Sequence, residues 1–280
     1  MKPTRLIMSS IHLTRREPWE AQLRRASELG FWGIEVFGGD LVAGNLTDPS
    51  VLGGLRTTSE RLGLALTAHP WFDWACDAID DNVDRLRELL ERCRQMSVRM
   101  VNIHLSFLAV PADGCERAAK IVAPLLSTLV ANDQELYFEN VPGFLENPLG
   151  SQPGEFLEFF RLLAYHPRIG FNLDVGHAHA TGNLPRFIRE LRRQWRYTHL
   201  HDNNGAADEH LAPGMGSVDW AGFARTLKSV QYGGPFVLEF PERFLPQGGT
   251  QLAPLFIGNG WHWPEMPAVL PGRTDRCSMK

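Results

Sequence analysis

The chain has 280 residues and carries 28 Lys and Arg residues against 32 Asp and Glu residues, a formal net charge of −4. With 44% apolar and 21% charged residues, its composition is that of a globular protein and excludes a disordered, collagen-like or coiled-coil chain. No basic excess points to a nucleic acid or an anionic membrane. The first residues, MKPTRLIMSSIHLTRRE, hold no signal-peptide core, and no later run has the roughly 18 apolar residues of a membrane span, so we expect a cytoplasmic protein.

Eight short apolar runs recur along the chain. They lie near residues 5–10, 33–37, 64–70, 100–105, 135–140, 168–176, 197–203 and 235–240. Helix-like stretches with 3.6-residue periodicity, such as DDNVDRLRELLERCRQM and CERAAKIVAPLLSTLVA, separate them. The steps between strand centres, about 26 to 39 residues, fit one strand, one helix and two loops. Eight such units predict a closed (β/α)8 TIM barrel, and the alternative is an open doubly wound sheet.

We expect one catalytic barrel domain over residues 1–244 and a C-terminal tail over residues 245–280. The tail shows no clean helical period and is rich in Pro and Gly. Three interpretations of the tail remain open: a lid over the barrel mouth, a dimer contact or a disordered end.

Ionisable side chains recur near the C-terminal end of seven of the eight predicted strands. Because side chains alternate along a strand, these residues share one face and their apolar neighbours share the other. The seven are Glu35, His69, His104, Glu139, Asp174, His199 and Glu239. Crowded into one barrel mouth, they would repel one another and lose hydration unless a cation joined them. Oxygen and nitrogen ligands suit Mn, Zn, Co, Fe or Mg, so we predict a divalent metal site. Glu35 is expected only to brace the loop after its strand.

Two loops extend this constellation. After Asp174 the chain runs Val-Gly-His177, a tight turn that lets Asp174 and His177 both face the mouth. After the seventh strand, the segment HLHDNNGAADEHLAPGMGSVDW adds further polar residues. These are His201, Asp202, Asp208 and His210. Trp71 follows the third strand and could pack on the face of a substrate ring.

The motifs FNLDVGH, HLHDNNG…DEHLAPGMG and VLEF, in this order on successive strand ends, resemble the xylose-isomerase-like TIM barrel superfamily over residues 5–240. That superfamily holds sugar phosphate isomerases and epimerases as well as endonuclease IV-type nucleases (AP endonuclease family 2). The resemblance implies a metal site formed by Glu139, Asp174, His199 and Glu239, whose two glutamates also act as acid and base. The nuclease branch binds up to three zinc ions, and its further ligand positions are filled by His69, His104, His177, Asp208 and His210.

The resemblance and the ligand set predict a divalent-metal-dependent isomerase or epimerase of a small sugar, ketose or hydroxy-ketone. Glu139 and Glu239 would remove and return a proton through an enediolate, with one to three metal ions bound. His177, His201 and Trp71 are the predicted substrate contacts. The alternatives are an endonuclease IV-like multinuclear zinc phosphodiesterase acting on abasic DNA, and a metal-dependent lyase or non-catalytic partner barrel. Because the mouth loops are acidic or neutral, we expect a carbohydrate partner rather than nucleic acid, and a homo-oligomer stays open.

Overall fold

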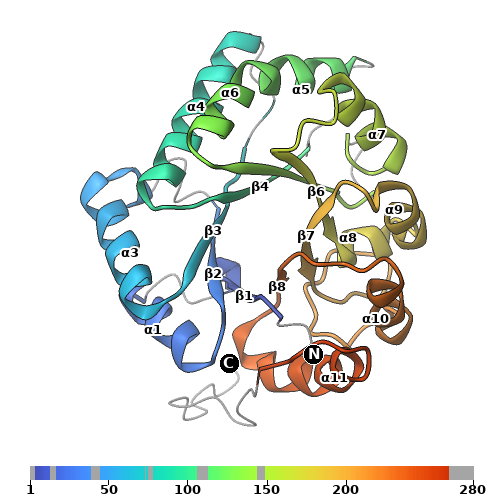
Figure 1. Ribbon diagram of the computed structural model, residues 1–280. Coiled ribbons are helices and arrows are strands. Elements are labelled where there is room, and N and C mark those ends of the chain that lie inside the picture. The colour runs from blue at the N-terminus through green and yellow to red at the C-terminus, as the bar shows by residue number, and fades with distance from the viewer. Residues whose placement is uncertain are drawn as a thin grey trace, which may run out of the picture.

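The computed structural model describes residues 4–12, 17–38, 45–72, 74, 78–105, 113–143 and 149–264, and it confirms the predicted closed parallel barrel (Figure 1). Each strand pairs in parallel with the next, and the last pairs with the first. The strands are β1 (Leu6–Ser9), β2 (Gly33–Phe37), β3 (Ala65–His69), β4 (Met100–His104), β5 (Glu135–Glu139), β6 (Ile169–Asp174), β7 (Trp195–Leu200) and β8 (Phe236–Leu238). All eight fall where the apolar runs predict them.

Helices surround the barrel and cover the outer faces of its strands (Figure 1). They are α1 (Trp19–Glu28), α3 (Pro49–Leu62), α4 (Ile79–Gln95), α5 (Gly114–Val122), α6 (Leu126–Ala131), α7 (Pro153–Leu162), α8 (Val175–Ala180), α9 (Leu184–Leu191), α10 (Trp220–Ser229) and α11 (Leu245–Gly258). Short 3-10 turns are η1 (Ser10–His12), η2 (Asn45–Thr47), η3 (Ala123–Leu125) and η4 (Glu242–Phe244). Within these ranges, no helix combines the length and the apolar character needed to cross a membrane.

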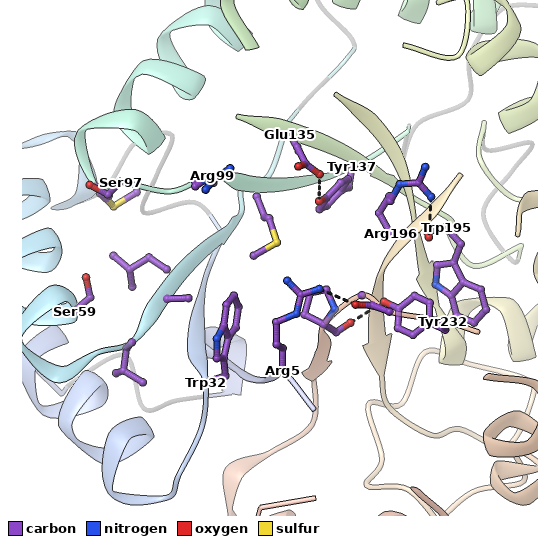
Figure 2. A pocket seen from close by; sticks show the side chains of 18 of the residues that line it. Arg5, Trp32, Ser59, Ser97, Arg99, Glu135, Tyr137, Trp195, Arg196 and Tyr232 are labelled. Carbon is purple, nitrogen blue, oxygen red and sulfur yellow. Dashed lines mark hydrogen bonds between the residues drawn. The ribbon is translucent and has the colours of Figure 1, made fainter. Parts of the chain in front are cut away.

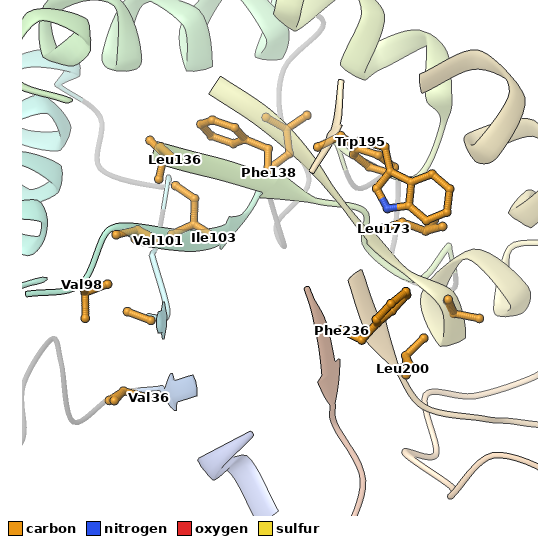
Figure 3. Packing of buried hydrophobic residues seen from close by; sticks show 14 of the residues in the cluster. Val36, Val98, Val101, Ile103, Leu136, Phe138, Leu173, Trp195, Leu200 and Phe236 are labelled. Atoms are coloured by element: carbon orange, nitrogen blue, oxygen red, sulfur yellow. The ribbon is translucent and has the colours of Figure 1, made fainter. Parts of the chain in front are cut away.

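The alternation of side chains along each strand divides the core into two parts. Outward residues such as Ile103, Phe138 and Leu173 belong to the large apolar cluster between strands and helices (Figure 3). Aromatic contacts tie the layers together, as where the Phe138 and Phe159 rings lie 4.6 Å apart. Inward residues form a much smaller apolar cluster of Ile7, Tyr137, Tyr197 and Val237. The rest of the interior, toward the carboxyl ends of the strands, is therefore left to polar side chains.

The segment after β8 differs from the expected tail, because its first fourteen residues form helix α11, Leu245–Gly258. Phe256 of this helix packs against Phe236 of β8, with ring centroids 5.1 Å apart. The helical pattern is hard to read from the sequence because Pro254 and two glycines interrupt it. At Gly248, a Cβ atom would lie 2.6 Å from the Phe240 ring, so glycine permits this close packing. Residues 265–280 lie outside the described residues.

Candidate metal centre

Four buried side chains meet at the carboxyl end of the barrel. The group consists of Glu139, Asp174, His199 and Glu239, and one ligand atom from each lies within 4.8 Å of the others. His199 Nδ1 is its centre, 3.3 Å from Glu139 Oε2, 3.8 Å from Asp174 Oδ2 and 2.9 Å from Glu239 Oε2. The strand register brings them together, because Asp174 on β6 pairs with His199 on β7. The structure thus assembles the four residues that the resemblance implies as ligands.

The chemistry of this group fits a divalent cation. Within the described part of the chain, three of its buried atoms have no hydrogen-bond partner, namely Glu139 Oε1, His199 Nδ1 and Glu239 Oε2. Polar atoms left unpaired in a protein interior are costly, and carboxylates at such close range repel one another. A cation among these oxygen and nitrogen donors would give a partner to His199 Nδ1 and Glu239 Oε2, which lie 2.9 Å apart.

The orientation of His199 also suits a ligand. Its Nε2 lies 3.2 Å from Glu35 Oε2, and a carboxylate only accepts, so the proton on this side belongs to the ring. The lone pair of the neutral ring is then on Nδ1, which faces Glu139 and Glu239. Glu35 itself is fully buried inside the barrel, so its contact with His199 replaces the expected bracing of the loop after β2.

Two asparagines hold Glu139 in place. The side-chain amides of Asn102, on β4, and Asn172, on β6, both donate to Glu139 Oε2, the latter at 2.8 Å. The same Oε2 faces His199 Nδ1, whereas Oε1 faces His104 Nε2 and His177 Nδ1, each 3.4 Å away. Neither asparagine was predicted, yet each stands two residues before an inward residue, His104 or Asp174, and therefore shares its face. Strict application of the alternation rule would have identified both.

Histidines on β3 and β4 extend the site on the other side of Glu139. His69 Nε2 lies 3.5 Å from Glu139 Oε2, and His104 Nε2 lies 3.4 Å from Glu139 Oε1. His69 Nδ1 donates to the Asn102 carbonyl oxygen over 3.1 Å, which leaves its Nε2 lone pair facing Glu139. Glu139 belongs to three of the four groups of described residues that could hold a metal ion. Its carboxylate is thus placed to be shared between ions.

A second group adjoins the first, formed by residues of helix α8 and of the loop after β7. It consists of His177, His201, Asp208 and His210. Asp208 Oδ2 lies 3.3 Å from His177 Nε2 and 3.2 Å from His210 Nε2. The Nδ1 atoms of these two histidines donate to backbone carbonyls, His177 to Asn140 at 2.8 Å and His210 to Glu239 at 2.7 Å. Backbone bonds that orient histidines in this way are typical of metal ligands.

The predicted substrate contacts occupy different depths. His201 is fully buried, its Nε2 lies 3.0 Å from Asp174 Oδ1, and its ring stacks on His210 at 4.2 Å. His201 therefore contacts residues that are themselves candidate metal ligands. Its predicted contact with the substrate stays a prediction. Trp71 is 47% exposed and its ring lies 6.0 Å from that of His104. Trp71 is thus at the open side of the site, where a ring platform was predicted.

Local structure explains the loop motifs. Asp174 ends β6 and caps α8, accepting from the His177 backbone N–H at 2.6 Å. Gly176 is required because a Cβ atom there would lie 2.0 Å from the His201 ring. Asp202 fastens the following loop with one buried carboxylate. Its oxygens accept from the backbone of Asn203, Gly214 and Val218 and from the indole of Trp220.

The electrostatics of the metal-free site favour protonated histidines beside ionised carboxylates. Burial opposes a charge on His199, but Glu139, Glu239 and Glu35 outweigh it and raise its pKa well above the usual value. Burial likewise opposes a charge on His210, while its hydrogen bond to Asp208 and the charge of Glu239 raise its pKa to about 9. Despite their burial, the pKa values of Glu139 and Glu239 are lowered, chiefly by His199. A bound cation would replace these protons.

A cavity of about 680 Å³ lies at the opposite, amino-terminal end of the barrel (Figure 2). Arg5, Trp32, Tyr137 and Arg196 are among its lining residues, and Glu135 accepts a hydrogen bond from Tyr137 there. Its lining includes none of the predicted site residues. The candidate metal centre is therefore a compact polar cluster rather than part of this hollow.

Comparison with known proteins gives a family and a set of similar folds. A family profile described as xylose isomerase-like TIM barrel matches residues 23–254. An uncharacterized protein of Methanocaldococcus jannaschii is 28% identical over 167 residues, which cover 56% of this chain and 56% of that protein. A second one from the same organism is 25% identical over 153 residues, covering 53% of this chain and 58% of that protein. This chain thus matches little more than half the length of these relatives.

Solved structures of sugar epimerases share the fold. A D-tagatose 3-epimerase-like protein has a TM-score of 0.76 at 20% identity, covering 92% of this chain and 98% of that one. The 3-keto-D-glucoside 4-epimerase from E. coli has a TM-score of 0.70 at 17% identity, covering 90% and 98%. An L-ribulose 3-epimerase has a TM-score of 0.69 at 20% identity, covering 85% and 82%. At these identities the likeness concerns the fold.

Proposed function

Because the chain belongs to the xylose isomerase-like TIM barrel family, we propose that it is a divalent-metal-dependent epimerase or isomerase of a small sugar, ketose or hydroxy-ketone. One observation carries the proposal. Two buried glutamates, Glu139 of β5 and Glu239 directly after β8, approach the same nitrogen of His199, with their Oε2 atoms 3.3 Å and 2.9 Å from Nδ1. Each carboxylate also has one oxygen without a hydrogen-bond partner among the described residues, Oε1 of Glu139 and Oε2 of Glu239. That solved structures of similar fold are described as sugar epimerases supports the same reaction class.

The residues of the site have distinct roles in this reaction. A divalent ion held by Glu139, Asp174, His199 and Glu239 would supply Lewis acidity toward the carbonyl and hydroxyl oxygens of the substrate. Glu239 Oε2 takes the proton from the carbon beside the carbonyl, and the electron pair of the broken C–H bond stays on the substrate as an enediolate. The Glu139 carboxylate takes up a proton from solvent and delivers it to the opposite face of that carbon or to the neighbouring carbon, and Glu239 releases its proton to solvent. The first outcome is epimerisation and the second is isomerisation.

Proton exchange gives a direct test of this proposal. The protein is loaded with Mn²⁺ or Zn²⁺ and incubated with a panel of ketoses and hydroxy-ketones in D2O. Proton transfer through glutamate carboxylates exchanges with solvent, so we expect deuterium at the reacting carbon together with a new epimer or isomer, followed by NMR. Metal-loaded protein that neither converts nor labels any member of the panel contradicts the proposal.

The second group of histidines favours one other candidate, a multinuclear phosphodiesterase. His177, Asp208 and His210 could hold a further cation beside the first, and Glu139 belongs to three of the four groups of described residues that could hold one. Several ions together can activate water and stabilise the leaving oxygen of a phosphodiester. Metal stoichiometry and cleavage of an abasic-site DNA duplex test this candidate. His210→Ala separates the two functions, because it should abolish phosphodiester cleavage and leave most of the epimerase activity.

A further inference from the structure

Glu35 is the buried acid that the proposed reaction does not use. It is 0% exposed, and it belongs to none of the groups of described residues that could hold a metal ion. Its Oε2 lies 3.2 Å from His199 Nε2. We propose that Glu35 is a positioning residue that fixes which nitrogen of His199 faces the metal. The inference rests on the metal site of the proposed function and not on its sugar chemistry.

Glu35 is itself held by a chain of hydrogen bonds across the barrel. The Tyr197 hydroxyl lies 3.0 Å from Glu35 Oε2 and 2.8 Å from Thr67 Oγ1. Because Glu35 only accepts, Tyr197 donates to it and accepts from Thr67. The three residues come from β2, β3 and β7, and all are fully or almost fully buried. The acceptor for His199 is therefore fixed by three strands rather than by a loop.

Fixing the ring decides whether His199 is a ligand at all. A half-turn of the imidazole would put Cε1 against Glu35 and replace Nδ1 by a carbon beside Glu139 and Glu239. Glu35 accepts a hydrogen bond from only one orientation of the His199 ring. In the flipped ring, the C–H group that replaces Nε2 cannot donate the hydrogen bond to Glu35 that Nε2 makes. A buried carboxylate that accepts from a histidine and thereby orients its other nitrogen is the usual support of a metal-bound histidine.

The amide of glutamine can substitute for this acceptor, which provides a sharp comparison. Among the described residues, Glu35 Oε1 has no hydrogen-bond partner. Glu35→Gln can thus place its amide oxygen at the position of Oε2 and its nitrogen at that of Oε1. Glu35→Leu has a similar volume but no acceptor. A matched control is Glu135→Leu, because Glu135 also accepts from a barrel tyrosine, Tyr137 at 2.5 Å, but at the other end of the barrel (Figure 2).

The experiment measures the affinity of the metal-free full chain for Zn²⁺ by competition with a chromophoric chelator. We expect Glu35→Leu to lose about 10- to 100-fold in affinity, the range found when a second-sphere partner of a ligand is removed. Glu35→Gln should stay near the wild type, and so should Glu135→Leu. Equal affinity of Glu35→Leu and the wild type overturns the inference, as does an equal loss in both Glu35 variants. Wild-type protein that binds no Zn²⁺ overturns the metal site itself, and with it this inference.

Nitrogen NMR of the Zn²⁺-loaded wild-type protein tests the same point without a substitution. With 15N-labelled histidine, His199 should show zinc on Nδ1 and a proton on Nε2. Zinc on Nε2 overturns the inference even if Glu35→Leu fails to fold. Absence of sugar turnover, in contrast, affects only the proposed reaction and leaves this ring assignment standing.

Discussion

The two glutamates of the centre differ in how firmly they are held. Glu139 Oε2 accepts from both Asn102 and Asn172, whereas Glu239 Oε2 has no hydrogen-bond donor among the described residues and faces His199 Nδ1 at 2.9 Å. Hydrogen bonds to a carboxylate stabilise its charged form and weaken it as a base. In the proposed reaction, Glu239 is therefore better suited to take the first proton, and Glu139 is better suited to hold the metal ion.

Replacing Glu239 by glutamine tests this assignment. Glu239→Gln keeps the side-chain volume but removes the proton acceptor, so kcat should fall by about 10²- to 10⁴-fold, the usual contribution of a general base. The melting temperature of the metal-free protein should change little. Glu209→Gln is the control, because Glu209 lies on a mouth loop and its hydrogen bonds among the described residues are to Asn204. Wild-type turnover by Glu239→Gln would show that this glutamate is not the base.

The raised pKa values of the histidines predict how metal binding depends on pH. His199 and His210, the latter with a pKa of about 9, hold protons at neutral pH in the metal-free protein. A metal ion must displace these protons, so its affinity should weaken by about tenfold per pH unit and per proton as the pH falls. The stability of the metal-free fold depends on pH in the opposite direction. Because folding raises the pKa of these histidines, their protonation stabilises the folded chain at low pH, and this stabilisation is lost as the pH rises through the raised pKa. Zinc titrations at several pH values measure the slope, and a pH-independent affinity contradicts it.

At the scale of elements, the strands were predictable and some helices were not. The apolar runs predict all eight strands because parallel barrel strands are buried on both faces. Two features of the helical layer escaped. Pro124 divides the stretch predicted as one helix into α5, η3 and α6, since proline has no backbone N–H to donate. In α11, the glycines that permit close packing also hide its amphipathic pattern.

In the candidate site, too, some features were predictable from the sequence and others were not. Residues on strands, such as Glu139 and His199, follow from alternation alone, and the loop residues Asp208 and His210 were singled out by their position after a polar strand end. Their hydrogen-bond partners could not be read in this way. The contact between Glu35 and His199 joins residues 164 positions apart, on β2 and β7, and depends on how far each side chain reaches across the closed barrel.

The turn between β6 and α8 gives a prediction at this scale. In Gly176→Ala the new methyl group meets the His201 ring at 2.0 Å, so we expect a loss of about 1–3 kcal/mol in the free energy of unfolding from overpacking. Gly54→Ala in α3 is the control, because nothing lies within 4 Å of its Cβ position, and it should stabilise by about 0.5–1 kcal/mol. Urea denaturation measures both. Equal stability of Gly176→Ala and the wild type would mean that α8 shifts freely.

At the scale of the whole molecule, the polar interior predicts that stability depends on the proposed metal. The metal-free barrel encloses several ionisable groups, in which like charges repel and opposite charges attract one another. A cation that binds the folded chain but not the unfolded chain adds its binding free energy to the stability of the fold. Zn²⁺ at about 1,000 times its Kd should contribute about 4 kcal/mol and raise Tm by roughly 10 °C. Differential scanning fluorimetry of stripped and reloaded protein measures this. An unchanged Tm with both Zn²⁺ and Mn²⁺ contradicts a structural contribution of the metal.

The alternation of inward and outward residues has a consequence for how such a chain can vary. In β5, Phe138 faces the helices and the neighbouring Glu139 faces the centre. Deleting one residue within the strand would exchange these two faces, placing an aromatic ring among the histidines and a carboxylate under the helices. Insertions and deletions are thus confined to the connections between strands. Inside the strands we expect point substitutions alone to be tolerated, with inward positions altering the chemistry of the site and outward positions altering the packing of the helices.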